Sequence, residues 1–199
     1  RFYHREFGVR RVVLPRVLSL EEIRMLNRRI SVETEVFAFG GMCVMAEGRC
    51  SLSSYATGES PNMNGVCSPA AHVHYEERGD STVSRLGNFT INVYGNDEKV
   101  GYPTLCKGRF RAMDKAGYLF EEPTSLDVTA ILPELADAGV TALKIEGRQR
   151  GKAYITQVVG AFRASLDRIA NGQTGTRSNL AALSEGQADT TGAYRRSWQ

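Results

Sequence analysis

Four cysteines are the residues of this 199-residue chain best suited to chemistry by type and spacing. Six, sixteen and thirty-eight residues separate them in the order Cys43, Cys50, Cys67 and Cys106. The first three lie in a stretch rich in glycine, serine and small polar residues, which is poor material for a hydrophobic core. Four thiolates can bind zinc or an iron–sulfur cluster. Spacing alone leaves open zinc, iron–sulfur, disulfides, and buried cysteines that only fill space.

The neighbours of the cysteines favour a metal site, although the short C-x2-C spacing of zinc ribbons and ferredoxins is absent. Arg49 and Lys107 are each adjacent to a cysteine and favour its thiolate form electrostatically. Glycine allows the backbone to approach a cluster closely and to donate amide hydrogen bonds to sulfur. One glycine lies near each cysteine: Gly41, Gly48, Gly65 and Gly108.

A second group of candidate residues is charged and lies on two predicted strands. In "VTALKIEG", Lys144 and Glu146 share one face, and the apolar residues between them share the other. In "VETEVFAF", Glu35 lies on one face with another glutamate and a phenylalanine. If the apolar faces meet helices, these charged groups point inward near strand ends, where barrel enzymes place catalytic groups. The predicted catalytic residues are Lys144, Glu146, Glu35 and Arg148, and a structural ion-pair network is the alternative.

The elements that must position these groups alternate between strand and helix at both ends of the chain. Apolar patterns predict strands at 9–18, 32–41, 117–125 and 140–147. Helical spacing predicts helices at 20–30, 125–139 and 153–172. Ser19 and Glu22 form a capping box before the first helix. Pro133 is an internal flaw of the second helix, and a hairpin is predicted at 89–102 with its turn at Gly95–Asp97.

This alternation predicts an α/β fold built of parallel βα units. Four strands make half of an eight-stranded barrel, so we expect the C-terminal half of a TIM-barrel-like (βα) fold with a long cysteine-rich insertion. A small open α/β sheet with the same insertion is the alternative. The chain begins without Met, which we interpret as a processed start or a fragment. The predicted parts are a βα unit with the following strand (1–40), the cysteine-rich segment (41–112), a βαβα part (113–172), and a loop and tail (173–199).

Composition excludes several classes of protein. The chain is 42% hydrophobic with a net charge of +3, which fits a folded domain and does not by itself imply nucleic acid. No apolar run approaches the roughly 18 residues of a membrane span, and no signal pattern begins the chain, so a cytoplasmic location is expected. Neither Gly-x-Ser-x-Gly nor His-Glu-x-x-His is present, so the residues do not support protease chemistry.

The first cysteines stand in a longer pattern. "EVFAFGGMCVMAEGRCSLSS" resembles the signature E-x-F-x-x-G-x-x-C-x(4)-G-x-C-x-x-S of the collagenase-like peptidase family, and "GYPTLCKGRF" and "LKIEGRQRGKAY" resemble further blocks of that family. The residues in register are Glu35, Phe37, Gly40, Cys43, Gly48, Cys50 and Ser53. The resemblance implies a 4Fe–4S cluster bound by Cys43, Cys50, Cys67 and Cys106. Relatives named as peptidases often carry a further cysteine where this chain has Ser68-Pro69-Ala70.

Within the family, the variants "FAFGG" and "CSPA" and the closing "TGAYRRSWQ" are most similar to a ubiquinone biosynthesis branch. That resemblance implies an enzyme subunit that hydroxylates a ubiquinone precursor ring without O2. It further implies prephenate as hydroxyl donor and a homologous UbiV-like partner in a heterodimer, with no nucleic acid. The alternatives are an RNA (tRNA or rRNA) hydroxylase that uses the basic "KGRFRAMDK", a collagenase-like peptidase, and a non-catalytic iron–sulfur scaffold.

Overall fold

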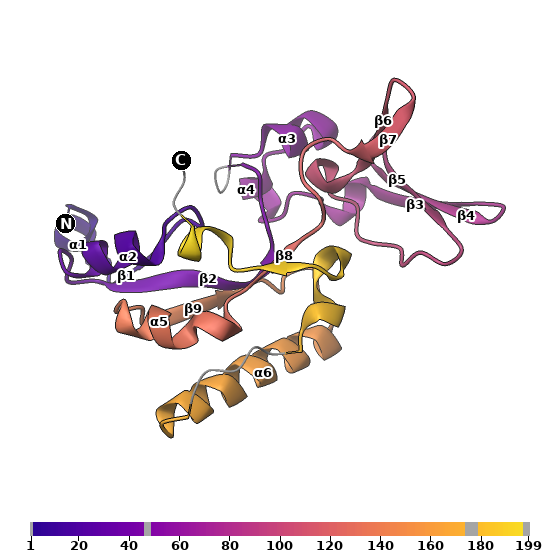
Figure 1. Cartoon of the computed structure of the whole chain (residues 1–199). Helices are drawn as coiled ribbons and strands as arrows, with labels where there is room; N and C mark the ends of the chain where they lie inside the picture. The colour runs from indigo at the N-terminus through magenta and orange to yellow at the C-terminus, as the bar shows by residue number, and fades with distance from the viewer. Residues whose placement is uncertain (1, 46–48, 174–178, 197–199) are drawn as a thin grey trace. The chain divides into compact units, whose positions relative to one another are not determined.

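The computed structural model describes residues 2–45, 49–173 and 179–196 (Figure 1). The chain divides into two compact units. The first unit combines Arg1–Met42 with Thr124–Gln199, and the second runs from Cys43 to Pro123. The predicted boundaries at residues 40 and 112 stay predictions. No helix of the described residues is long and apolar enough to cross a membrane.

The first unit is built on a five-stranded mixed sheet with β2 at its centre. β2 runs parallel to β1 and β9 and antiparallel to β8, which in turn pairs with β10. Because Phe39 of β2 faces both Asp127 of β8 and Ile145 of β9, these two strands lie on opposite edges of β2. The strands are β1 (Arg11–Val13), β2 (Glu33–Gly41), β8 (Ser125–Asp127), β9 (Ala142–Ile145) and β10 (Asp189–Thr190).

The α/β class is therefore confirmed, and the parallel pairing of β1, β2 and β9 agrees with the sequence pattern. In the part of the chain that the structure describes, the sheet is open and mixed rather than closed. The half-barrel stays a prediction.

Most helices and 3-10 turns of the first unit supply apolar residues to the core on this sheet, whereas the first helix, Phe2–Phe7, buries none. The helices are α1 (Phe2–Phe7), α2 (Leu20–Asn27), α5 (Leu132–Asp137) and α6 (Lys152–Ala170). The 3-10 turns are η3 (Thr129–Ile131), η4 (Ala181–Leu183), η5 (Glu185–Gln187) and η6 (Gly192–Arg195). In the core, Phe39 packs against Phe162 of α6 with ring centroids 6.2 Å apart. Each such buried side chain contributes about 1.5–3 kcal/mol to folding.

The capping box before α2 is confirmed. The backbone N–H of Glu22 donates to Ser19 Oγ at 3.3 Å, and the Ser19 N–H donates to the Glu22 carboxylate at 2.8 Å. The predicted helix at 125–139 is wrong in its first half, because residues 125–127 form strand β8. The Asp127 carboxylate there accepts from the backbone N–H and the hydroxyl of Thr129, which ends the strand. Pro133 lies in the first turn of α5, where proline is tolerated, and is no internal flaw.

The second unit contains a three-stranded meander and a two-stranded ribbon. The predicted hairpin with its turn at Gly95–Asp97 is wrong, because β5 ends at Gly95 and pairs backward with β4. The turn between them uses Gly87, whose φ is +56°. The strands are β3 (Val73–Arg78), β4 (Ser81–Leu86), β5 (Phe89–Gly95), β6 (Arg109–Ala112) and β7 (Lys115–Tyr118). The helical elements are α3 (Ser51–Thr57), α4 (Pro61–Asn64), η1 (Ala70–His72) and η2 (Leu105–Lys107).

Candidate functional site

All four cysteines lie in the second unit, and all four are free thiols. Cys43 is exposed just after β2, and Cys50 is the N-cap of α3. Cys67 is half-buried, and Cys106 in η2 is only 8% exposed. The structure thus places the predicted ligands in one compact unit and in four different local environments.

Ser53 connects two of the cysteine segments. Its backbone N–H donates to the sulfur of Cys50 at 3.3 Å, and its hydroxyl donates to the carbonyl oxygen of Cys67 at 2.5 Å. The Ser53 side chain is buried, so these hydrogen bonds are shielded from water. The serine of the signature therefore holds the start of α3 beside the chain at Cys67.

The Cys106 thiol has a strongly perturbed pKa. Burial raises its pKa to about 12, and the nearby Lys107 ammonium opposes that rise. The thiols of Cys67 and Cys43 raise the pKa of Cys106 further, so each of these two lies within electrostatic reach of Cys106. A metal that binds here must displace the Cys106 proton, because only the thiolate is a ligand.

The chemistry of this donor set fits an iron–sulfur cluster, since four free thiols occupy one unit. Within the described ranges, however, no three Cys, His, Asp or Glu side chains converge closely enough to hold a single metal ion. The assignment of Cys43, Cys50, Cys67 and Cys106 as ligands stays a prediction.

One of the glycines near the thiols, Gly108, is required by packing. A Cβ atom on Gly108 would lie 2.6 Å from the Phe110 ring, so packing alone requires glycine there. Gly48 lies outside the described residues.

The predicted catalytic residues lie in the first unit, and the structure brings two of them together. Lys144 Nζ is 3.6 Å from a carboxylate oxygen of Glu35, and Arg11 is 3.7 Å from the other. The Glu35 side chain is 17% exposed, whereas that of Lys144 is 44% exposed. Phe37 lies beneath this pair, with Lys144 Nζ 5.8 Å and Arg16 Cζ 4.4 Å from its ring centre. Arg11 also forms a closer ion pair, at 2.7 Å, with Glu33, so the cations of this face are partly compensated by two carboxylates.

Glu146 and Arg148 follow at the end of β9. The Glu146 N–H donates to the Phe39 carbonyl at 2.8 Å, and its side chain covers Gly40. Arg148 is exposed in the turn after the strand. Sequence reasoning missed Arg150, which forms an ion pair with Glu185 at 2.9 Å and stacks on Tyr154 at 5.2 Å. Its basic segment was visible, but its acidic partner lies far along the chain.

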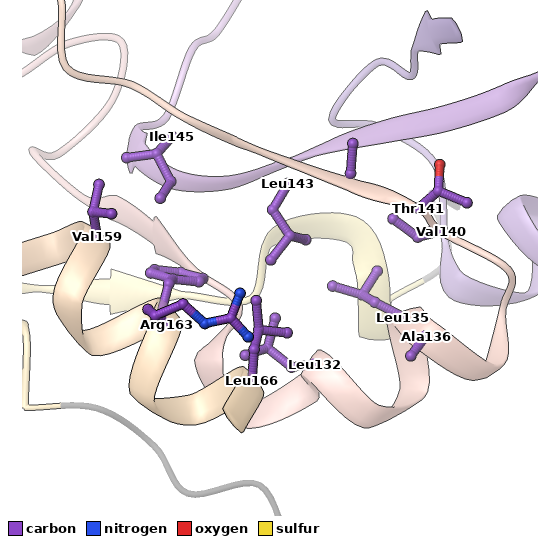
Figure 2. A pocket seen from close by; sticks show the side chains of 12 residues that line it. Leu132, Leu135, Ala136, Val140, Thr141, Leu143, Ile145, Val159, Arg163 and Leu166 are labelled. Atoms are coloured by element: carbon purple, nitrogen blue, oxygen red, sulfur yellow. The ribbon is translucent and has the colours of Figure 1, made fainter. Parts of the chain in front are cut away.

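The opposite face of β9 is apolar. Figure 2 shows Leu143 and Ile145 pointing into a pocket between β9, α5 and α6. The volume of this pocket is about 360 Å³. Apart from Arg163, the pocket offers little to orient a polar ligand, whereas ligand sites combine apolar walls with placed polar groups. The lining residues are Leu132, Leu135, Ala136, Val140, Thr141, Ala142, Leu143, Ile145, Val159, Phe162, Arg163 and Leu166.

The sequence matches the family described as peptidase family U32 over residues 1–197. The chain belongs to peptidase family U32. This result confirms the collagenase-like family that the cysteine signature indicated.

Several curated relatives of this U32 chain are named for RNA hydroxylation. The tRNA hydroxylation protein P of Escherichia coli K12 is 31% identical over 98% of this chain and 47% of its own length. The 23S rRNA 5-hydroxycytidine C2501 synthase of the same organism is 29% identical over 92% of this chain and 23% of its own length. A collagenase of Porphyromonas gingivalis is 26% identical over 86% of this chain and 37% of its own length.

The chain thus spans less than half the length of these relatives. No solved structure matches it significantly. The names of these relatives concern tRNA, rRNA and collagen, so the finer resemblance to the ubiquinone biosynthesis protein UbiU stays a prediction.

Proposed function

We propose that this U32 chain takes part in the hydroxylation of RNA bases. The observation that carries the proposal is its similarity, over 98% of its residues, to a tRNA hydroxylation protein. An rRNA 5-hydroxycytidine synthase matches over 92% of the chain, so tRNA and rRNA are both candidate substrates. Because the chain covers less than half of each relative, the complete activity is proposed for the protein that contains this chain.

We assign Cys43, Cys50, Cys67 and Cys106 as the residues that would hold a 4Fe–4S cluster. Such a cluster supplies a route for electrons, which hydroxylation without O2 requires. The chain's own contribution is to prepare the ligands. Ser53 donates its backbone N–H to Cys50 sulfur, and hydrogen bonds to ligand sulfur tune a cluster's potential. The buried Lys107 places a positive charge beside Cys106, which favours loss of the thiol proton.

In the first unit, the proposed substrate-facing residues are Lys144, Glu146, Glu35 and Arg148. The pair of Glu35 and Lys144 can exchange hydrogen bonds with a polar group, because Lys144 remains accessible. Arg11 divides its charge between Glu33 and Glu35, and the exposed ammonium of Lys144 can still attract an anionic group beside its ion pair with Glu35. A purely structural ion-pair network is the competing role for these residues.

The test is nucleoside analysis of RNA from cells that lack the protein containing this chain. We expect a hydroxylated nucleoside in tRNA or rRNA to disappear and to return when the intact gene is restored. Complementation with Cys106→Ala should fail to restore it. An unchanged nucleoside profile in both RNA classes would contradict the proposal.

Hydroxylation of a ubiquinone precursor is a second candidate, because "FAFGG", "CSPA" and "TGAYRRSWQ" resemble that branch of the family. It would use prephenate as hydroxyl donor and a UbiV-like protein as heterodimer partner. Quinone analysis of the same cells under anaerobic growth separates the two candidates. Accumulation of unhydroxylated quinone precursors with normal RNA nucleosides would favour this one.

A further inference from the structure

The ribbon of β6 and β7 carries an unusual set of exposed side chains. Its four residue pairs run from Arg109 opposite Tyr118 to Ala112 opposite Lys115, and Met113 and Asp114 form the turn. Opposite residues in an antiparallel pair point to the same side. Arg109, Arg111 and Tyr118 therefore share one face of the ribbon.

The other face is partly covered at the base of the ribbon. Phe110 packs against the small core of the second unit and meets Phe120 edge-on, with ring centroids 6.3 Å apart. This contact fixes which face is turned outward. Tyr118, on the opposite face, remains 39% exposed, and Arg111 is exposed beside it.

The positive charge of the ribbon is only partly compensated. Arg109 forms an ion pair with Glu98 at 2.7 Å, which raises the pKa of Arg109. Arg111 on the outer face and Lys115, which lies opposite Ala112 on the other face beside the turn, form no ion pair with any residue that the structure describes. Two cations are thus available to an anionic ligand.

Apolar side chains accompany these cations. Met113 at the tip is 94% exposed and has a φ of +54°, a backbone conformation that few residues other than glycine adopt. The positive φ belongs to the two-residue hairpin turn, whereas the almost fully exposed Met113 side chain adds nothing to the core. Leu119 and Phe120, just after β7, are 57% and 51% exposed. The surface thus combines two uncompensated cations with exposed aromatic and flexible apolar groups.

We propose that the ribbon surface, defined as Arg111 and Tyr118 on the outer face with Met113 and Lys115 at and across the tip, binds single-stranded segments of RNA. Cations pair with phosphates while aromatic side chains stack on unpaired bases. Charge complementarity favours RNA over an uncharged apolar partner. The inference rests on the proposed function, which supplies RNA as substrate, and it deepens that function by naming where the RNA is held.

Binding of a fluorescent, unmodified tRNA transcript to the full chain tests this proposal across a series of salt concentrations. The variant Arg111→Glu/Lys115→Glu should bind at least tenfold more weakly. Loss of two phosphate contacts should also reduce the slope of log K against log salt by about 1.4 to 1.8. Tyr118→Ala should weaken binding about tenfold through loss of one stacked base.

Matched controls separate a local effect from a change of net charge. Arg28→Glu/Lys152→Glu changes two exposed basic residues of the first unit and alters the net charge equally. Tyr3→Ala removes an exposed tyrosine there. We expect these controls to bind RNA within about twofold of the unchanged chain, since specific contacts rather than total charge dominate. If Arg111→Glu/Lys115→Glu fails to fold, Arg111→Gln/Lys115→Gln replaces it.

Equal affinity of the ribbon and control variants for RNA would overturn the proposal. A second result would also overturn the proposal: the unchanged chain binds anionic phospholipid vesicles but not RNA, and Tyr118→Ala abolishes the vesicle binding. That result would indicate that the ribbon contacts a membrane surface. Nucleoside analysis of cells that carry each variant tests the proposed function separately. Normal RNA hydroxylation with a ribbon variant that still binds RNA would refute the ribbon surface and leave the proposed function standing.

Discussion

The side chain of Glu146 lies where a side chain on residue 40 would have to lie, and only the glycine at that position leaves room for it. A Cβ atom on Gly40 would lie 2.5 Å from the Cβ of Glu146, and Gly40 has a φ of +143°. The glycine of the cysteine signature is thus required by a residue more than a hundred positions later. This contact joins the end of β2 to the end of β9, where the candidate catalytic residues lie.

Gly40→Ala should therefore destabilise the first unit. A clash with a neighbouring side chain and an unfavourable φ together should lower the free energy of unfolding by about 2–4 kcal/mol. Urea denaturation followed by circular dichroism measures the change. Gly160→Ala is the control, because an added Cβ there meets no atom within 4 Å in helix α6. It should raise stability by up to about 1 kcal/mol. Equal effects of the two substitutions would contradict this account.

Ser53→Ala should destabilise the contact between the start of α3 and the chain at Cys67. It removes the buried hydroxyl that donates to the Cys67 carbonyl and leaves that oxygen without this donor. We expect a loss of about 1–3 kcal/mol in unfolding free energy, together with reduced iron content. Ser51→Ala, at an exposed position of the same helix, should change neither quantity. A Ser53→Ala protein with unaltered stability would show that the hydroxyl contributes nothing.

Anaerobic purification with iron and sulfide analysis tests the proposed ligands. We expect about four irons and four sulfides per chain. Substitution of any one of Cys43, Cys50, Cys67 or Cys106 by Ala should lower the iron content severalfold. Full retention of iron in one of these variants would remove that residue as a ligand. Stoichiometric zinc without iron would disprove the iron–sulfur assignment.

Glu35→Gln should separate the catalytic role of the charged face from a structural one. As a substrate-facing residue, Glu35 should be needed for hydroxylation, and its loss should reduce the modified nucleoside more than about tenfold. Unfolding free energy should fall by less than about 1 kcal/mol, because partly exposed ion pairs contribute little. Glu33→Gln, which removes a more exposed carboxylate of β2, is the control. Normal modification with lowered stability would favour the structural network.

The capping box of α2 predicts a pH dependence. Hydrogen bonds from the Ser19 backbone and hydroxyl hold the pKa of Glu22 below its usual value of 4.5. A lowered pKa stabilises the folded chain above pH 4.5, and this stabilisation is lost as pH falls through the lowered value. The difference in thermal midpoint between the unchanged chain and Glu22→Gln should therefore shrink on acidification. Glu21→Gln, which lacks the capping role, should show a difference that depends less on pH.

Features that depend on neighbouring residues could be predicted from the sequence. The capping box at Ser19 agrees with the structure, and the helix predicted at 153–172 ends only two residues earlier than expected, at Ala170, because both features have local causes. Strand β8 could not be predicted, because its three residues begin an apolar run with helical spacing. Its strand form depends on pairing with β2 and β10, which come from distant parts of the chain.

In the candidate site, too, features with local causes could be predicted and features that depend on distant residues could not. Alternation along each strand correctly separated Lys144 from the apolar residues that line the pocket of Figure 2. The approach of Arg11 to Glu35 was not visible, because it depends on the register of β1 against β2. The family signature selected the cysteines, whereas the burial of Cys106 follows from η2 and its surroundings.

Strands β2 and β8 pair antiparallel, and the Met42 N–H donates to the Thr124 carbonyl at 3.0 Å just beyond them. The chain leaves the first unit at one of these residues and returns at the other. Because the two crossing points are hydrogen-bonded neighbours, a short linker could span them without disturbing the sheet. Changes in the length of the second unit therefore need not alter the register of the sheet in the first unit.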